Sequence, residues 1–65
     1  MTLVRFGKHW NIETVADYEK AMETLADNEF CANMSDDYNR TWEELGEIQR
    51  QRRDVIAQAK AKNII

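Results

Sequence analysis

The feature that most constrains this chain is the lack of residues that interrupt a helix. It contains no proline, and its only glycines are Gly7 and Gly46. Residues with strong helix preference fill positions 12–62. Because proline and glycine most disfavour helix interiors, the sequence predicts an all-α fold. The 65 residues suffice for a single domain with a small core.

The first helix is predicted to span residues 11–31. Asn11 can accept a hydrogen bond from a helix amide as the N-cap, and Trp10 would pack against Val15 across this start. Apolar side chains then recur at helical spacing, with charged residues on the opposite side. These apolar residues are Val15, Tyr18, Met22 and Leu25. The pattern indicates an amphipathic helix.

The second helix is predicted to span residues 35–62. Ser35 is the expected N-cap, and Asp36 and Asp37 place two negative charges at the positive end of the helix dipole. At 1.5 Å per residue this helix would be roughly 40 Å long, against roughly 29 Å for the first helix. The second helix is therefore expected to be the longer one.

A short connection makes the two helices antiparallel neighbours, so the sequence predicts a helical hairpin with an extended N-terminal arm, residues 1–10. In this hairpin the shorter first helix is expected to reach along the second helix only as far as Arg52. Apolar residues continue beyond that point, at Val55, Ile56 and Ala59. They must be covered by the arm, by a second chain or by both, and we expect both. The arm is either a short strand or an irregular extended segment.

A homo-oligomer, with a dimer favoured, is therefore part of the prediction. Small domains need additional stabilisation, and the single Cys31 excludes an internal disulfide. The predicted self-association residues are Arg52, Val55, Ile56 and Ala59. Because Arg52 lies in the middle of an apolar face, its guanidinium needs an acceptor. Glu13 is the nearest candidate within one chain, and a symmetric neighbour is the alternative. We expect Arg52 to set the pairing register of the dimer.

A second candidate surface lies on the flank of the second helix, where Trp42, Gly46 and Arg53 project near one another. Tryptophan and arginine are common anchors in protein interfaces, although a tryptophan at helical spacing is more often part of a core. Glycine inside a helix costs about 1 kcal/mol relative to alanine. Either another group approaches Gly46 closely, or the glycine is simply tolerated.

The three arginines at positions 50, 52 and 53 raise the alternative of nucleic-acid binding. On a helix they point in three directions, whereas phosphate binding needs several cations on one face. Residues 13–47 hold eleven acids against Lys20 and Arg40, a net charge of −9, and residues 48–65 carry +4. A nucleic-acid-binding regulator that uses the basic second half of the helix is the less favoured reading.

Other functional classes lack the residues that they need. There is no phosphate-binding glycine loop and no nucleophile with an attendant base, so an enzyme is not expected. Cys31 and His9 are too few to hold structural zinc, and no cofactor is predicted. No apolar run approaches the ~20 residues of a membrane span, and no signal peptide is evident, so a cytoplasmic protein without membrane contact is expected.

The run VRFGKHWNIETVADYEKAMETLADNEFCANMSDDYNRTWEELGEIQRQRRDVI, in a short chain without catalytic motifs, resembles the small early proteins encoded between the exo and xis genes of lambda-like bacteriophages. The resemblance lies in general character and assigns no functional residue. It implies an accessory protein made early in infection, which influences the choice between lysis and lysogeny through contacts with host or phage factors. The sequence thus favours a non-enzymatic regulator that acts by protein–protein interaction.

Overall fold

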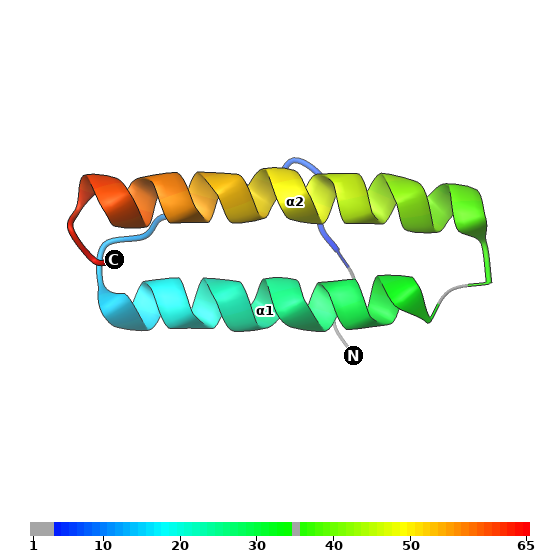
Figure 1. The fold of residues 1–65 in the computed structure, drawn as a ribbon, viewed down its shortest axis with the longest axis horizontal. Helices are drawn as coiled ribbons and strands as arrows, with labels where there is room; N and C mark the ends of the chain where they lie inside the picture. The colour runs from blue at the N-terminus through cyan, green and yellow to red at the C-terminus, as the bar shows by residue number, and fades with distance from the viewer. Residues whose placement is uncertain (1–3, 35) are drawn as a thin grey trace.

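Two antiparallel helices form the body of the molecule in a computed structural model that describes residues 4–34 and 36–65 (Figure 1). Helix α1 spans Val15–Asn33 and helix α2 spans Tyr38–Ala61. The Cα positions extend over 39 × 18 × 15 Å. The predicted helical hairpin is confirmed, and α2, with 24 residues against 19, is the longer helix.

Helix α1 begins four residues later than the sequence predicted. Its N-cap is Thr14 rather than Asn11: the Thr14 hydroxyl accepts from the Asp17 amide at 3.2 Å, and the Asp17 carboxylate accepts from the Thr14 amide at 3.2 Å. This reciprocal capping box satisfies two amides at once. Val15 is 54% exposed and is not among the residues packed on the core, whereas Trp10 is. The helix continues to Asn33, two residues past the predicted end.

Helix α2 is capped at both ends by local backbone and side-chain contacts. The Asp37 carboxylate accepts from the Arg40 amide at 3.2 Å, while the predicted cap, Ser35, lies outside the described residues. At the other end Asn63 has a positive φ of 58°, and the Ile64 amide donates to the Ala59 carbonyl at 2.8 Å. This Schellman-type ending folds Ile64 back onto the core.

The core is the seam between the two helices. Fully or nearly fully buried positions recur at spacings of three and four, as expected for facing helices. On α1 they are Ala21, Leu25, Asn28 and Ala32, and on α2 they are Glu44, Ile48, Gln51, Val55 and Ala59. Ile12, in the segment before α1, is 1% exposed and completes the core.

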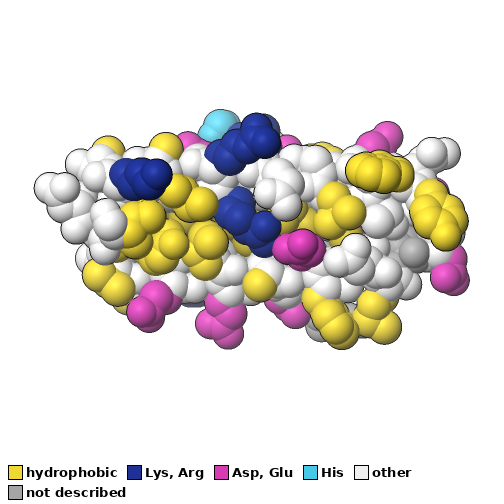
Figure 2. Space-filling view, viewed as in Figure 1, with side chains coloured by type: hydrophobic (Ala, Val, Ile, Leu, Met, Phe, Trp, Pro, Cys, Tyr) yellow, Lys and Arg dark blue, Asp and Glu magenta, His cyan; other side chains and the backbone are white. Residues whose placement is uncertain are grey.

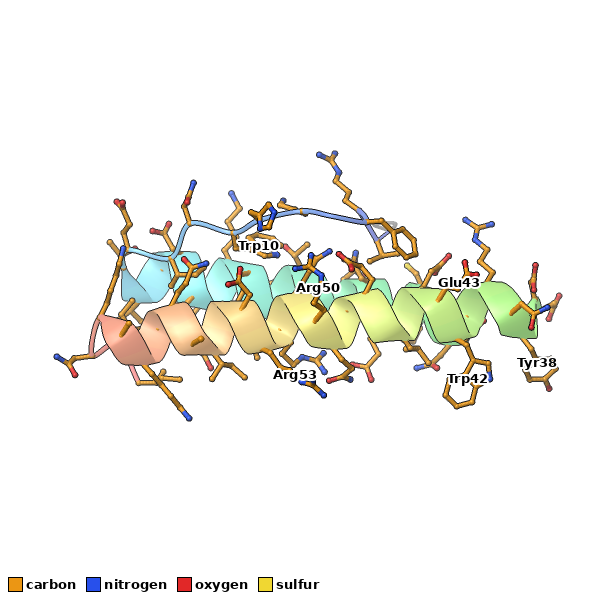
Figure 3. All side chains as sticks on the ribbon, turned by 90° about the horizontal axis from the view of Figure 1, so that it is seen from above. Trp10, Tyr38, Trp42, Glu43, Arg50 and Arg53 are labelled. Carbon is orange, nitrogen blue, oxygen red and sulfur yellow. The ribbon has the colours of Figure 1, made fainter. Side chains whose placement is uncertain are left out.

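The described part of the N-terminal arm, residues 4–10, turns at Phe6 and Gly7 and then runs extended along α2, beside the helical seam (Figures 1 and 3). It runs in the same direction as α2, since Gly7 is bonded to Glu47 and Ile12 to Gln58. Five extended residues at ~3.3 Å and eleven helical residues at ~1.5 Å both cover about 16 Å, so the two segments keep in step. No strand is found in the described residues. The arm therefore forms a third layer without forming a sheet.

The apolar residues in the second half of α2 are covered in part by the arm of the same chain. Val55 and Ala59 are 0% exposed within a single chain, with Ile12, Trp10 and Ile64 in the same core cluster. These two side chains have no surface to offer a second copy in this conformation. Ile56 and Arg52 are partly exposed. Neither described helix combines the length and the apolar character needed to cross a bilayer.

Candidate interaction surface

The three clustered arginines have three different environments. Arg50 donates to the Glu47 carboxylate at 2.7 and 2.9 Å and to the Lys8 carbonyl at 3.1 Å. Arg52 donates to Glu29 at 2.8 Å. Arg53 is exposed and makes no ion pair within residues 4–34 and 36–65. They do not form one basic stripe.

Arg52 reaches a different acid from the one expected. Its partner is Glu29, near the end of α1, rather than Glu13, before its start. Helical side chains lean toward the N-terminus of their own helix. In an antiparallel hairpin, Arg52 therefore leans toward the C-terminal half of α1, and Glu29 leans back toward Arg52. The pair is partly exposed, with 23% and 37% of the two side chains accessible.

Glu47 gathers the contacts that hold the start of the arm. Its carboxylate accepts from Arg50, from the Gln51 side-chain amide at 2.7 Å and from the Gly7 backbone amide at 2.9 Å. The hydrogen bonds from Arg50 lower the pKa of Glu47 to about 2, assisted by those from Gln51 and Gly7 and opposed by desolvation. The same contact raises the pKa of Arg50. These charges hold the arm in place.

A continuous exposed stripe runs along α2 on the side away from the arm, and we call it the outer face of α2. It consists of seven exposed residues at spacings of 4, 4, 3, 4, 4 and 3: Tyr38, Trp42, Gly46, Gln49, Arg53, Ala57 and Lys60. Figure 3 shows Tyr38, Trp42 and Arg53 on one side of α2, with Arg50 and Trp10 on the other. The structure therefore places the predicted set Trp42, Gly46 and Arg53 on one face.

The aromatic residues of the outer face are not part of the core. Tyr38 is 83% exposed and Trp42 is 74% exposed. Gly46 is equally open, since a Cβ atom built there would meet no heavy atom within 4 Å. Close approach within the chain thus does not explain the glycine.

The sequence interpretation missed two further exposed apolar residues beside the helix connection. Phe30 is 60% exposed and Met34 is 61% exposed. Figure 2 shows several separate apolar side chains at this end of the molecule and a larger apolar group in the other half. Helical spacing could not have shown this, since Phe30 lies on α1, Met34 is its C-cap, and Tyr38 and Trp42 lie on α2. The chain leaves four large apolar side chains in solvent around one end of the hairpin.

Comparisons of the chain with protein-family models, with curated proteins and with solved structures found no match. Among the described residues, no group of three histidine, cysteine or acidic side chains is arranged to hold a metal ion. The surface itself is therefore the basis for a functional assignment.

Proposed function

We propose that this chain is a small non-enzymatic accessory protein that acts by binding other proteins through the outer face of α2. One observation carries the proposal: Trp42 and Tyr38 are 74% and 83% exposed on the same face. Large aromatic side chains contribute most to protein interfaces when a partner removes them from water.

The distribution of apolar residues supports this proposal. Three of the seven buried apolar residues are alanines, whereas the exposed set includes a tryptophan, a tyrosine and two phenylalanines. The described residues thus bury four larger aliphatic side chains and no aromatic one, and they leave large aromatic side chains available for a partner. Contiguous exposed apolar surface commonly marks an interaction site.

We further propose that the partner is a host or phage protein and that the context is early phage infection. This step is supported by the resemblance to the small early proteins of lambda-like phages. In that setting, the protein shifts the choice between lysis and lysogeny by occupying a regulatory partner.

Nucleic-acid binding is the weaker alternative because two of the three arginines already have carboxylate partners. A phosphate would have to displace Glu47 from Arg50 and Glu29 from Arg52. A salt-sensitive mobility shift with DNA or RNA that Arg53→Ala abolishes would support this alternative instead.

The test combines a biological and a physical readout in bacteria infected with a lambda-like phage. Expression of the chain is expected to change the fraction of lysogens, and Trp42→Ala should remove most of that change. Val15→Ala is the matched control, since Val15 is exposed but lies on α1. An equal effect of wild type and Trp42→Ala would exclude the outer face as the site.

A photoreactive amino acid in place of Gln49 provides the physical readout, because Gln49 lies between Gly46 and Arg53 on the outer face. We expect a covalent adduct with a second protein, lost when Trp42 is also replaced by alanine. An adduct that persists without Trp42, or no adduct at all, would contradict the proposal.

A further inference from the structure

Six of the seven residues of the outer face of α2, all except Lys60, have a symmetric layout. They are Tyr38, Trp42, Gly46, Gln49, Arg53 and Ala57, and their spacings of 4, 4, 3, 4 and 4 read the same in both directions. The centre of this pattern falls between Gly46 and Gln49. Two copies of α2 laid face to face and antiparallel about that centre would bring equivalent surfaces together, as a two-fold dimer requires.

We infer that the outer face binds a second copy of this chain, with the two α2 helices antiparallel and the two-fold axis between Gly46 and Gln49. This inference rests on the proposed function: a second copy occupies the outer face until a host or phage protein displaces it, so the two partners compete for the same surface. In this register Trp42 faces Arg53 of the other copy, Gly46 faces Gln49, and Tyr38 faces Ala57.

Two of the three kinds of contact in this pairing set a large side chain against a small residue. Tyr38 meets the small Ala57, and Gln49 meets Gly46, where nothing within 4 Å occupies the space of a Cβ. A glycine at the helix crossing lets two backbones approach closely. The openness of Gly46, which no contact within one chain explains, has a role in this arrangement.

The Trp42 and Arg53 pairs lie on either side of the axis. Arg53 is the arginine of the cluster that has no ion pair with a described residue, so its guanidinium is available to stack on an indole ring. Arginine over tryptophan is a favourable cation–π contact. Each dimer would contain two such contacts, one on each side of the glycines.

The charge distribution selects the antiparallel direction. Residues 24–47, the half at the helix connection, hold seven acids and one base, a net charge of −6. The remaining residues hold eight bases and five acids, a net charge of +3, and the two halves sum to the −3 of the chain. An antiparallel pair sets each −6 half against a +3 half, whereas a parallel pair sets like halves together.

Sedimentation equilibrium of the full chain tests the assembly. We expect a dimer that weakens as salt is added. Trp42→Ala and Arg53→Ala should each raise the dimer dissociation constant by about tenfold or more, as expected for interface anchors. Val15→Ala should leave it unchanged, and circular dichroism should show that all variants remain helical. A wild-type chain that stays monomeric up to millimolar concentration would overturn the inference.

Thiol cross-linking tests the register while Trp42 and Arg53 stay in place. In a Cys31→Ser background, Tyr38→Cys and Ala57→Cys are prepared separately and then mixed under oxidising conditions. Each variant chain then carries a single cysteine, so no link can form within a chain. We expect a covalent dimer in the mixture and almost none from either variant alone.

Each remaining outcome contradicts the inference. Efficient cross-linking of Tyr38→Cys alone would indicate a parallel pair, and no cross-link in the mixture would exclude this register. The proposed function fails separately: a monomer whose effect on lysogeny depends on Trp42 keeps the function and removes the dimer. A dimer whose Trp42→Ala variant still changes the fraction of lysogens would keep the inferred dimer and remove the proposed function.

Discussion

The Gln58 side chain hydrogen-bonds to the Trp10 backbone, much as a neighbouring strand would. The Gln58 side-chain nitrogen donates to the Trp10 carbonyl at 2.6 Å, and its oxygen accepts from the Ile12 amide at 2.9 Å. About two turns earlier on α2, Gln51 accepts from the Trp10 indole at 3.0 Å and donates to the Arg5 carbonyl at 2.6 Å. Two glutamines seven residues apart on α2 thus satisfy the polar groups of the arm, which allows an extended segment to lie against a helical seam.

Replacing Gln58 with glutamate should therefore loosen the arm. The new carboxylate can accept from Ile12 but cannot donate to the Trp10 carbonyl, and it lies beside Asp54, which now accepts from Gln58 at 3.1 Å. We expect Gln58→Glu to lower the free energy of unfolding by about 1–3 kcal/mol. Urea denaturation followed by tryptophan fluorescence measures this change. Asn39→Asp, another change of an amide to a carboxylate but at an exposed site of α2 outside the outer face, should stay within about 0.5 kcal/mol of wild type, and equal losses would contradict this account.

Leu25→Ala should unfold most of the protein at room temperature. Leu25 is 0% exposed and is the one large apolar side chain of α1 that is fully buried. A buried leucine replaced by alanine costs about 2–5 kcal/mol, and a domain of this size has only about 3–5 kcal/mol available. Circular dichroism should show a large loss of helix. Val15→Ala should keep the wild-type spectrum, although the sequence interpretation placed both residues on one buried face. If both variants behave alike, the observed start of α1 is wrong.

The sequence alone predicted the two helices better than it predicted their ends. Helical spacing predicted both helices, because periodicity reports a buried stripe over many residues, and the short connection predicted their antiparallel order. The start of α1 was wrong because Asn11 and Thr14 are both good caps in isolation. The choice between them depends on the Ile12 amide, which Gln58 binds from the other end of the chain. A contact across 46 residues carries no local signal.

The candidate surface was predictable to a similar degree. Projection around the helix axis placed Trp42, Gly46 and Arg53 together, because helical geometry alone fixes that relationship. Their exposure was not predictable, since periodicity does not say which side of a helix the arm will cover. The partner of Arg52 was missed because the prediction matched residues at the same height along the two helices. It ignored the direction in which long side chains lean.

The Arg52 and Glu29 pair should contribute little to stability despite its 2.8 Å distance. Both side chains remain partly in water, and such pairs contribute about 1 kcal/mol or less. A double-mutant cycle with Arg52→Met and Glu29→Gln, followed by urea denaturation, measures the coupling. A coupling energy above about 2 kcal/mol would show that the pair behaves as a buried one. It would then be a determinant of the hairpin register rather than a surface contact.

Acid should destabilise the protein through Glu47. Folding lowers the Glu47 pKa from 4.5 to about 2, chiefly because Arg50 donates to its carboxylate. The unfolded chain therefore binds the proton more tightly between these two values, so the stabilisation is complete above about pH 5 and is lost as the pH falls toward 2. Urea midpoints measured from pH 7 to pH 2.5 should decline more steeply for wild type than for Glu47→Gln, which has no carboxylate to protonate.

Wild type and Glu47→Gln should also differ in stability at pH 7. Glu47→Gln should be less stable than wild type, because the neutral amide no longer attracts Arg50 and cannot accept as strongly from Gly7. Glu43→Gln is the matched control: Glu43 is an exposed glutamate of the same helix, and its replacement should leave the steep decline in place. Parallel pH profiles for wild type and Glu47→Gln would mean that the arm is held mainly by the neutral amides of Gln51 and Gln58. In that case the charges around Gly7 would be incidental to the fold.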